Sequence, residues 1–450
     1  MRVKAFITLL SLLLFTACFK DDNFSYKSSY AGSGSVEELT RVPSQETRSV
    51  LLLYSAGFNS LNSYLAEDIE DLAKGFLPGR EVRSDPVLLV YSRQPYTYVQ
   101  TNGLEKPDYS TKTRSFLIRL YAGADGQPHR DTLRAWSKSK AACSAETMQD
   151  VLTYVRDQFP AKSYGMIFSS HASGWLPATY YDNPNTYEKT HTADAGVPIS
   201  PYSLRRALPQ EDYPAIEAFP AVKSIGQDQY TAESIEMELK DFADAIPMHL
   251  DYLLLDACLS GGVEVAYQLR GKVDVVGFSQ TEILADGFNY STLGAHLLKQ
   301  EPDPVSVCVD YFQHYDAQSG QDRSATISVV DTRKMDALAA VCRELFDTYR
   351  EQLHTMSSSS VQRYFRFDRH FFYDLEDILL KAGITAEEQA ALEAALDECI
   401  VYKAATPSFL SIPLNTTSGF SMYLPSRGTN LLDHFYRSNM AWNDATRLIP

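Results

Sequence analysis

Short and nearly unbroken apolar runs recur along this 450-residue chain as far as residue 278, with amphipathic segments between them. The runs occupy residues 50–54, 87–91, 116–121, 166–168, 252–255 and 273–278. Continuous rather than alternating apolar strands are typical of a mainly parallel sheet that helices cover on both faces. Helical apolar spacing occupies residues 61–73, 147–159 and 232–246. The alternation predicts an α/β fold, an αβα sandwich with a mostly parallel central sheet.

The chain is longer than the roughly 250–300 residues at which a single core stops growing, so we expect two packed parts. Beyond about residue 330 the pattern changes to helices at 334–353, 371–382 and 386–400, with short strands at 410–412 and 419–423. We therefore expect a main domain at residues 49–330 and a smaller C-terminal α+β part at residues 331–450, packed on it. The Pro-, Tyr-, Asn- and Asp-rich stretch 176–229 is predicted to be a long loop, of the kind that is usually functional or disordered.

The N-terminus carries the features of an export signal. Two cations precede an apolar run at residues 5–15, and small residues lead to Cys18. The run is shorter than the roughly 20 residues that span a bilayer. Residues 14–18 resemble a bacterial lipobox, which predicts a lipoprotein-type signal peptide at 1–17, lipidation of Cys18 and a flexible tether over 18–48. We expect an exported cell-envelope protein, an outer-membrane lipoprotein; the alternative is a plain signal peptide with an incidental cysteine.

The charge balance disfavours nucleic acid as a partner. Acidic residues number 57 against 41 basic ones, giving a formal net charge of -16. Nucleic-acid binding draws its affinity from Lys and Arg, so such a role is disfavoured. A negative field is compatible with a cationic substrate.

Five cysteines remain besides Cys18. An odd number in an exported protein leaves at least one thiol without a partner inside the chain, and no spacing typical of structural zinc is present. They are Cys143, Cys258, Cys308, Cys342 and Cys399, and the sequence does not determine whether the four other than Cys258 pair.

Two of the buried strands end in a reactive residue. His171 follows the run at 166–168, and Cys258 follows the run at 252–255. Ligands bind at the carboxyl ends of strands in such sheets, so the imidazole and the thiol are expected at one edge. An imidazolium and a helix N-terminus, here expected at residues 263–269, both favour the thiolate. Backbone N–H groups of Ala172 and Cys258 are candidates for an oxyanion hole.

These residues carry a resemblance to a known family. The segment 256–267 (DACLSGGVEVAY) is similar to the nucleophile motif of the clostripain family of cysteine peptidases, and 168–175 (FSSHASGW) is similar to its histidine motif. Residues 236–243 resemble the helix before the cysteine strand, and 279–290 (SQTEILADGFNY) resemble the substrate-pocket segment. The resemblance covers about residues 50–425, and only these four motifs are specific.

The resemblance implies a caspase-like fold and an endopeptidase that cleaves after Arg or Lys without a required cofactor. Position by position, it implies Cys258 as nucleophile, His171 as general acid and base, and Asp256 and Asp286 as the acids of the S1 pocket. Carboxylates are the groups that a buried guanidinium needs. Family members often cut themselves between the histidine and the cysteine, where Lys189, Arg205, Arg206 and Lys223 are candidate sites. Some members need calcium, which the sequence leaves open because the loop has no EF-hand spacing.

Other interpretations remain open. Cys258 and His171 could be inert core residues, Asp256 could cap a turn, and Asp286-Gly287 could be an ordinary turn. Ala172 stands where the family usually has glycine, which favours a lapsed, lipid-anchored binding or adhesion protein on the same scaffold. A gingipain-type peptidase is a third reading, disfavoured by the short motif set and the lack of adhesin repeats. The arginine- and aromatic-rich run 363–370 is predicted to be a packed, partly solvated surface rather than a nucleic-acid stripe.

Overall fold

The computed structural model describes most of the chain after residue 45. The described residues are 37–38, 46–80, 86–95, 98–101, 104–108, 110, 112–178, 180, 228–230, 233–366 and 371–450. The expected signal peptide, Cys18 and most of the expected tether lie outside these ranges, as do the candidate cleavage residues Lys189, Arg205, Arg206 and Lys223. Val36–Pro450 forms one compact unit.

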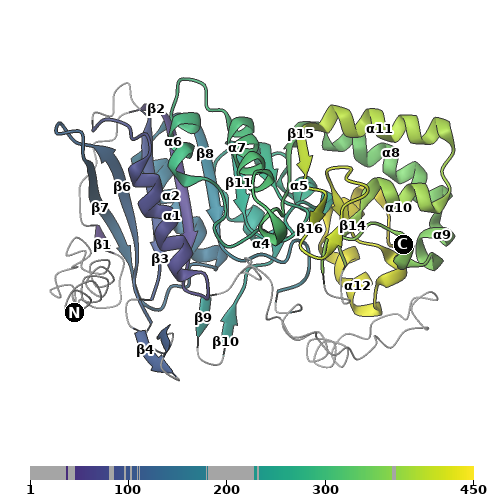
Figure 1. Cartoon of the computed structure of the whole chain (residues 1–450), viewed down its shortest axis with the longest axis horizontal. Helices are drawn as coiled ribbons and strands as arrows, with labels where there is room; N and C mark the ends of the chain where they lie inside the picture. Colours follow the sequence, from purple (N-terminus) through teal and green to yellow (C-terminus); the bar gives the residue numbers. More distant parts are fainter. Residues whose placement is uncertain are drawn as a thin grey trace, which may run out of the picture. The chain divides into compact units, whose positions relative to one another are not determined.

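A ten-stranded sheet forms the centre of this unit, in the order β1-β7-β6-β3-β2-β8-β11-β12-β13-β15 (Figure 1). The five central strands, β3-β2-β8-β11-β12, pair in parallel, and antiparallel strands extend the sheet at both sides. The strands span Glu37–Glu38 (β1), Thr47–Ala56 (β2), Val87–Arg93 (β3), Ser115–Ala122 (β6), Pro128–Trp136 (β7), Ala161–Ser169 (β8), Leu250–Asp256 (β11), Val273–Phe278 (β12), Thr326–Asp331 (β13) and Ile400–Ala405 (β15). The apolar runs of the sequence are buried in these strands because helices cover both faces.

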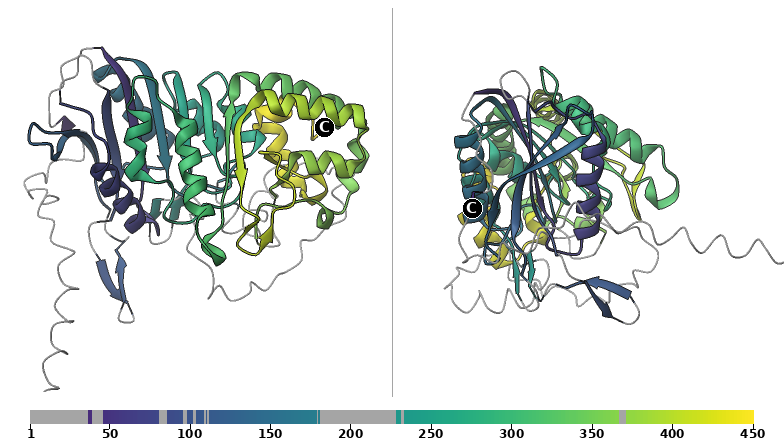
Figure 2. Two further views of the ribbon diagram at one scale, coloured as in Figure 1. Left: turned by 45° about the horizontal axis from the view of Figure 1, so that its top comes forward. Right: turned by 90° about the vertical axis from the view of Figure 1, so that its left-hand side faces the viewer.

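Helices α1 and α2 lie on opposite faces of the sheet (Figure 2). On one face α1 packs on α6, and α6 on α7; on the other α2 packs on α4, and α4 on α5. These helices span Asn62–Lys74 (α1), Ala145–Gln158 (α2), Leu239–Asp244 (α4), Val263–Leu269 (α5), Tyr290–Leu297 (α6) and Pro304–Asp316 (α7). The αβα sandwich that the sequence predicts is therefore confirmed.

Residues 331–450 gather beside β15, at one end of the sheet (Figure 1). Their helices are Met335–Thr348 (α8), Arg350–Thr355 (α9), Leu375–Ala382 (α10), Ala386–Cys399 (α11), Asn430–Asn439 (α12) and Ala441–Thr446 (α13). Short strands pair Tyr373–Asp374 (β14) with Ser421–Met422 (β18) and Ser408–Phe409 (β16) with Ile412–Pro413 (β17). Short 3₁₀ helices occupy Gly320–Asp322, Thr332–Lys334, Ser358–Ser360 and Pro425–Arg427. Because β15 pairs with β13, this part shares the central sheet with the rest of the chain.

The structure corrects the helix predicted at 232–246. Two antiparallel strands, Asp228–Tyr230 (β9) and Glu233–Ile235 (β10), form a hairpin, and only Leu239–Asp244 is helical. Ile235 matched the helical spacing, but it pairs with Asp228 across the hairpin. A second hairpin, Tyr98–Thr101 (β4) with Leu104–Pro107 (β5), follows β3. Both hairpins lie beyond the carboxyl edge of the parallel strands (Figure 1).

The β14–β18 ribbon is joined directly to the predicted nucleophile loop. The Ser421 N–H donates to the Gly261 carbonyl at 2.8 Å, and Gly262 forms a bridge with Ser421. Helix α5 starts immediately afterwards, at the residue that the sequence predicts. The C-terminal part therefore supports the loop that carries Cys258. None of the described helices has the length and apolar character to span a membrane.

Candidate active site

Strands β8 and β11 bring the two predicted catalytic residues to one edge of the sheet. They are parallel neighbours, and Asp256 pairs with Ser169 at the last register position. Cys258 and His171 each follow this pair by two residues. The edge is the carboxyl edge of the parallel strands, where the sequence places the site.

His171 is oriented by the end of a third parallel strand. Its Nε2 lies 3.0 Å from the Oγ of Ser60, which follows β2 and is exposed. The adjacent Ser170 hydroxyl donates to the carbonyl of Ala56, the last residue of β2, at 3.0 Å. His171 is buried, with 5% of its surface exposed, and the residue before it is tied to the end of β2. Sequence reasoning missed Ser60, because no motif marks a serine that follows a different strand.

The thiol of Cys258 is covered by the 279–290 segment. Cys258 is fully buried, and the Ile283 N–H donates to its Sγ at 3.2 Å. The next residue, Leu259, has a left-handed φ of 55° and donates its N–H to the Thr281 carbonyl at 2.9 Å. Non-glycine residues in this conformation cost energy and are concentrated at functional sites. In this state, a substrate carbonyl has no open path to the sulfur.

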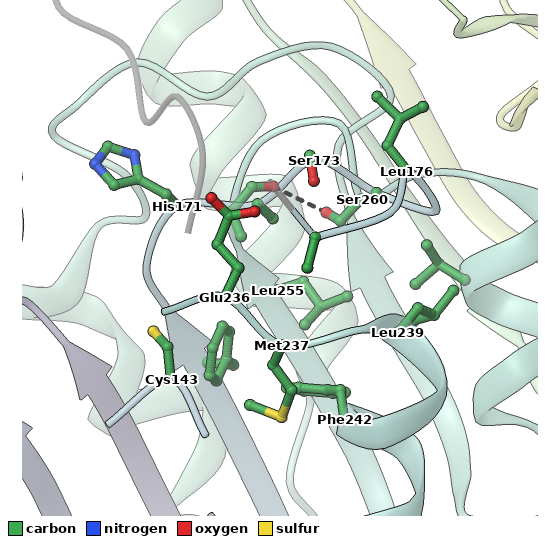
Figure 3. Close-up of a pocket in the computed structure, with 16 residues that line it drawn as sticks. Cys143, His171, Ser173, Leu176, Glu236, Met237, Leu239, Phe242, Leu255 and Ser260 are labelled. Atoms are coloured by element: carbon green, nitrogen blue, oxygen red, sulfur yellow. Dashed lines mark hydrogen bonds between the residues drawn. The ribbon is translucent and has the colours of Figure 1, made fainter. Parts of the chain in front are cut away.

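A pocket lies beside the two motifs (Figure 3). Ser173, Ser260 and Leu176 lie together at the top of this view, and Met237, Leu239 and Phe242 lie at the bottom. The apolar lining residues are Phe168, Leu176, Met237, Leu239, Phe242, Leu255 and Val265. Ala172 and Ala257 also border the pocket, whereas Cys258 is not among its lining residues. His171 therefore borders the pocket, whereas Cys258 does not.

The two predicted S1 acids have different surroundings. The Oδ2 of Asp256 accepts hydrogen bonds from the Ser169 hydroxyl at 2.9 Å and from the Tyr290 hydroxyl at 2.7 Å, and the residue is fully buried. Burial and the nearby Asp256 carboxylate raise the pKa of Tyr290 well above its usual value, which keeps it a donor. Asp286 is exposed in a turn, where Gly287 has a φ of 64°. Only Asp286 is immediately available to a group from solvent.

Glu282 is a further buried acid in the same segment. Its Oε1 lies 3.3 Å from an Nη of Arg366, and the two side chains are 1% and 9% exposed. Burial raises the pKa of Glu282 to about 7, and the Arg366 charge acts in the opposite direction. Both residues lie in segments that the sequence analysis names for other reasons: Glu282 in the expected substrate-pocket segment 279–290, and Arg366 in the arginine- and aromatic-rich run 363–370. Arg366 is partly buried; its run was predicted to be a packed, partly solvated surface, and 367–370 lie outside the described residues.

Glu264, in the first turn of α5, joins the nucleophile loop to the C-terminal part. Its Oε1 accepts from the Tyr423 N–H at 2.9 Å and from the Tyr436 hydroxyl at 2.7 Å. Both rings pack against Trp175 of the histidine motif, with centroids 4.7 Å and 5.1 Å from the indole. The carboxyl is buried, which raises its pKa to about 7.

This raised pKa predicts a pH-dependent stability. Between about pH 4.5 and 7 the folded protein binds a proton on Glu264 that the unfolded chain releases, so the free energy of unfolding falls as pH rises. Glu264→Gln keeps an acceptor for both donors and cannot ionise. Its free energy of unfolding relative to wild type is expected to rise by up to about 3 kcal/mol between pH 5 and pH 8. Chemical denaturation at both pH values measures the difference, with exposed Glu387→Gln as control; a pH-independent difference would contradict the prediction.

The described residues offer one group able to share a cation, His249, Asp251 and Asp274, whose ligand atoms lie within 4.8 Å of one another. These residues are at the amino ends of β11 and β12, the edge opposite Cys258. His249 lies 3.0 Å from Asp274, which also lies 3.6 Å from Arg333. This group is therefore separate from the candidate catalytic pair. No disulfide joins any of the five cysteines of the described part, all of which are buried.

Comparison with known proteins finds one matching family model and several similar solved structures. The model of the clostripain family, peptidase C11, matches residues 212–446, slightly more than half of the chain. An inactive zymogen C11 protease from Parabacteroides distasonis has a similar structure, with a TM-score of 0.66 and 26% identity over 90% of this chain and 99% of that one. A secreted C11 cysteine protease from Bacteroides thetaiotaomicron, solved with an irreversible peptide inhibitor, has a TM-score of 0.66 and 22% identity over 89% of this chain and 99% of that one. No curated protein matches the chain in sequence.

These findings agree with the architecture and with the order of the motifs. The family match includes Cys258 and the 279–290 segment, and the structural likeness covers 90% of the chain. The caspase-like fold that the resemblance implies is confirmed. The chain therefore belongs to the clostripain family of cysteine peptidases.

Proposed function

We propose that the protein is a cysteine endopeptidase that cleaves protein or peptide substrates after Arg or Lys. The parallel register of β8 and β11 carries this proposal, because it fixes His171 and Cys258 at equivalent positions on one sheet edge. Family membership supports the reaction class. Cys258 is the proposed nucleophile, and His171 the proposed proton carrier.

The chemistry follows from the two side chains. The Cys258 thiolate attacks the scissile carbonyl, and the N–H groups of Ala172 and Cys258 stabilise the oxyanion. His171 gives its proton to the leaving amine. It then takes a proton from water, which hydrolyses the thioester and regenerates the thiol. No organic cofactor enters this sequence, and calcium has no step in it.

The covered thiol supports a second part of the proposal, that the chain is made as an inactive precursor. The Ile283 N–H contacts the sulfur, and Cys258 has no exposed surface, so the 279–290 segment must move before a substrate can bind. A zymogen is among the similar structures. We propose activation by self-cleavage in the 189–223 loop, with Lys189, Arg205, Arg206 and Lys223 as candidate sites.

Cell location and partners complete the proposal. We propose export through the 1–17 signal and anchoring through Cys18, so that the membrane contact is made by the lipid alone. The excess of acidic residues supports a cationic substrate over a nucleic acid.

Asp286 is expected to set the preference for basic residues, because it is the exposed acid of the proposed S1 pair. Asp286→Asn should lower kcat/KM for an Arg peptide by about 100-fold, since a charged partner of a guanidinium is lost. The kcat/KM for a matched norleucine peptide should stay within about threefold. Steady-state kinetics on both peptides measure this, with the exposed and distant Asp444→Asn as control. Equal losses on both peptides would refute the S1 role.

The second candidate is a lapsed binding or adhesion protein on this scaffold. Ala172 and the covered sulfur favour it, because both hinder attack on a carbonyl. An arginine chloromethylketone separates the two candidates. Covalent labelling of wild type that is lost in Cys258→Ala supports the peptidase, and an unlabelled wild type, after cleavage of the loop with an added protease, supports the binding protein.

A further inference from the structure

The 279–290 segment is attached to the nucleophile loop on both sides of Glu282. On one side, the Thr281 carbonyl accepts the Leu259 N–H at 2.9 Å. On the other, the Ile283 N–H donates to the Cys258 sulfur at 3.2 Å. The position of Glu282 therefore fixes the position of the backbone that covers the thiol.

The Glu282 carboxylate has little compensation inside the protein. Its side chain is 1% exposed, and neither oxygen accepts a hydrogen bond within the described structure. The Arg366 guanidinium at 3.3 Å supplies the opposite charge. A buried charge that loses its partner is strongly destabilised, and it is relieved by taking a proton or by moving to water. Movement to water would take Ile283 away from the sulfur.

Arg366 is supported by a different part of the molecule. Two residues before it, the Tyr364 N–H donates to the Phe372 carbonyl at 3.0 Å, and the Tyr364 hydroxyl donates to Asp374 at 2.6 Å. Phe372 in turn packs beside Trp175, with ring centroids 6.5 Å apart. The backbone two residues before Arg366 is thus fixed within the C-terminal part, independently of the segment that the guanidinium contacts.

We propose that the Arg366–Glu282 ion pair is a latch that holds residues 281–283 over Cys258. Both are positioning residues: they act on the nucleophile through the Ile283 backbone and do not touch the sulfur themselves. This inference rests on the proposed function of Cys258 and adds a role for the C-terminal part. Loss of the pair releases the segment and exposes the thiol.

Alkylation of Cys258 tests the latch without requiring turnover. The variants are made in a His171→Ala background, which removes the proposed proton carrier and prevents self-cleavage from changing the sample. Iodoacetamide is added to the folded protein at pH 7.5, and peptide mass mapping gives a separate rate for each cysteine. The fully buried Cys308 and Cys342 report any global opening.

Arg366→Met is expected to raise the alkylation rate of Cys258 by at least 10-fold while the rates of Cys308 and Cys342 stay within twofold. Arg366→Lys keeps the charge and should remain within about threefold of the parent. The double variant Glu282→Met/Arg366→Met leaves no buried carboxylate without a partner, so its Cys258 alkylation rate should return toward that of the parent. That return separates a charge latch from simple loss of packing, which the double variant would not restore.

Two outcomes would overturn the inference. One is an unchanged Cys258 rate in a folded Arg366→Met variant. The other is a parallel rise at Cys258, Cys308 and Cys342, which indicates general unfolding. If Arg366→Met itself does not fold, Glu282→Gln removes the carboxylate that this change leaves without its ion-pair partner. The inference then requires Arg366→Met/Glu282→Gln to be folded, with a parent-like Cys258 rate. Failure of peptidase activity is a separate result, because alkylation requires only an accessible thiol.

Discussion

Replacing Cys258 by alanine is expected to lower kcat/KM for an Arg or Lys peptide by at least about 10⁴-fold, because covalent catalysis loses its nucleophile. His171→Ala should have an effect of similar size, and the double variant should lose little more, because the two residues act as a unit. The prediction follows from the register that places both residues at one edge of the sheet. It assumes that the thiol is uncovered before turnover.

Fluorogenic peptide hydrolysis measures this loss, and Cys308→Ala is the matched control, since it removes another fully buried thiol, which belongs to helix α7. Intact mass and N-terminal analysis of the same samples test activation. A cut between residues 189 and 223 that is present in wild type and absent in Cys258→Ala is expected. Full activity in Cys258→Ala would disprove the assignment, whereas an uncut but active wild type would disprove only self-activation.

Asp374→Ala is expected to cost about 3–5 kcal/mol of unfolding free energy. This buried carboxylate accepts hydrogen bonds from the Tyr364 hydroxyl at 2.6 Å, from the Ser418 N–H at 2.7 Å and hydroxyl at 2.8 Å, and from the Asp377 N–H at 2.9 Å, where it caps α10. Alanine removes the acceptor and leaves these donors buried without it, which is among the largest single-residue costs.

The measurement is chemical denaturation followed by tryptophan fluorescence. Asp336→Ala provides the comparison, because Asp336 forms an exposed ion pair with Arg270 and should cost less than about 1 kcal/mol. Asp374 also supports the β14–β18 ribbon that bonds to Gly261, so the variant should lose activity in proportion to its unfolded fraction. A change below 1 kcal/mol would show that the network relaxes around the missing group.

The sequence predicted six of the ten strands of the central sheet: β2, β3, β6, β8, β11 and β12. Strand β12 and helix α5 have the bounds that the residue pattern predicts, 273–278 and 263–269. A strand covered on both faces must be apolar at nearly every position, so composition alone marks it. Strands β1, β7, β13 and β15 escaped prediction: β7 and β15 are only partly buried, whereas β13 is almost fully buried and was missed all the same. The helix predicted at 232–246 was wrong in its first half, because tertiary pairing of Ile235 with Asp228 overrode a helical spacing.

The residues flanking the strands also identified the candidate catalytic pair, because chemistry at a sheet edge requires particular side chains immediately after particular strands. What the sequence left undetermined was the state of that pair. The contact of Ile283 with the Cys258 sulfur, the bond between Ser60 and His171, and the Arg366–Glu282 pair join segments that are distant in the chain. Such contacts depend on how separate helices, strands and loops pack together. The local preference of a segment for helix or strand does not predict that packing. The sequence therefore determined which groups are available for chemistry, and only the tertiary structure decided that the thiol is covered and which charges hold the cover in place.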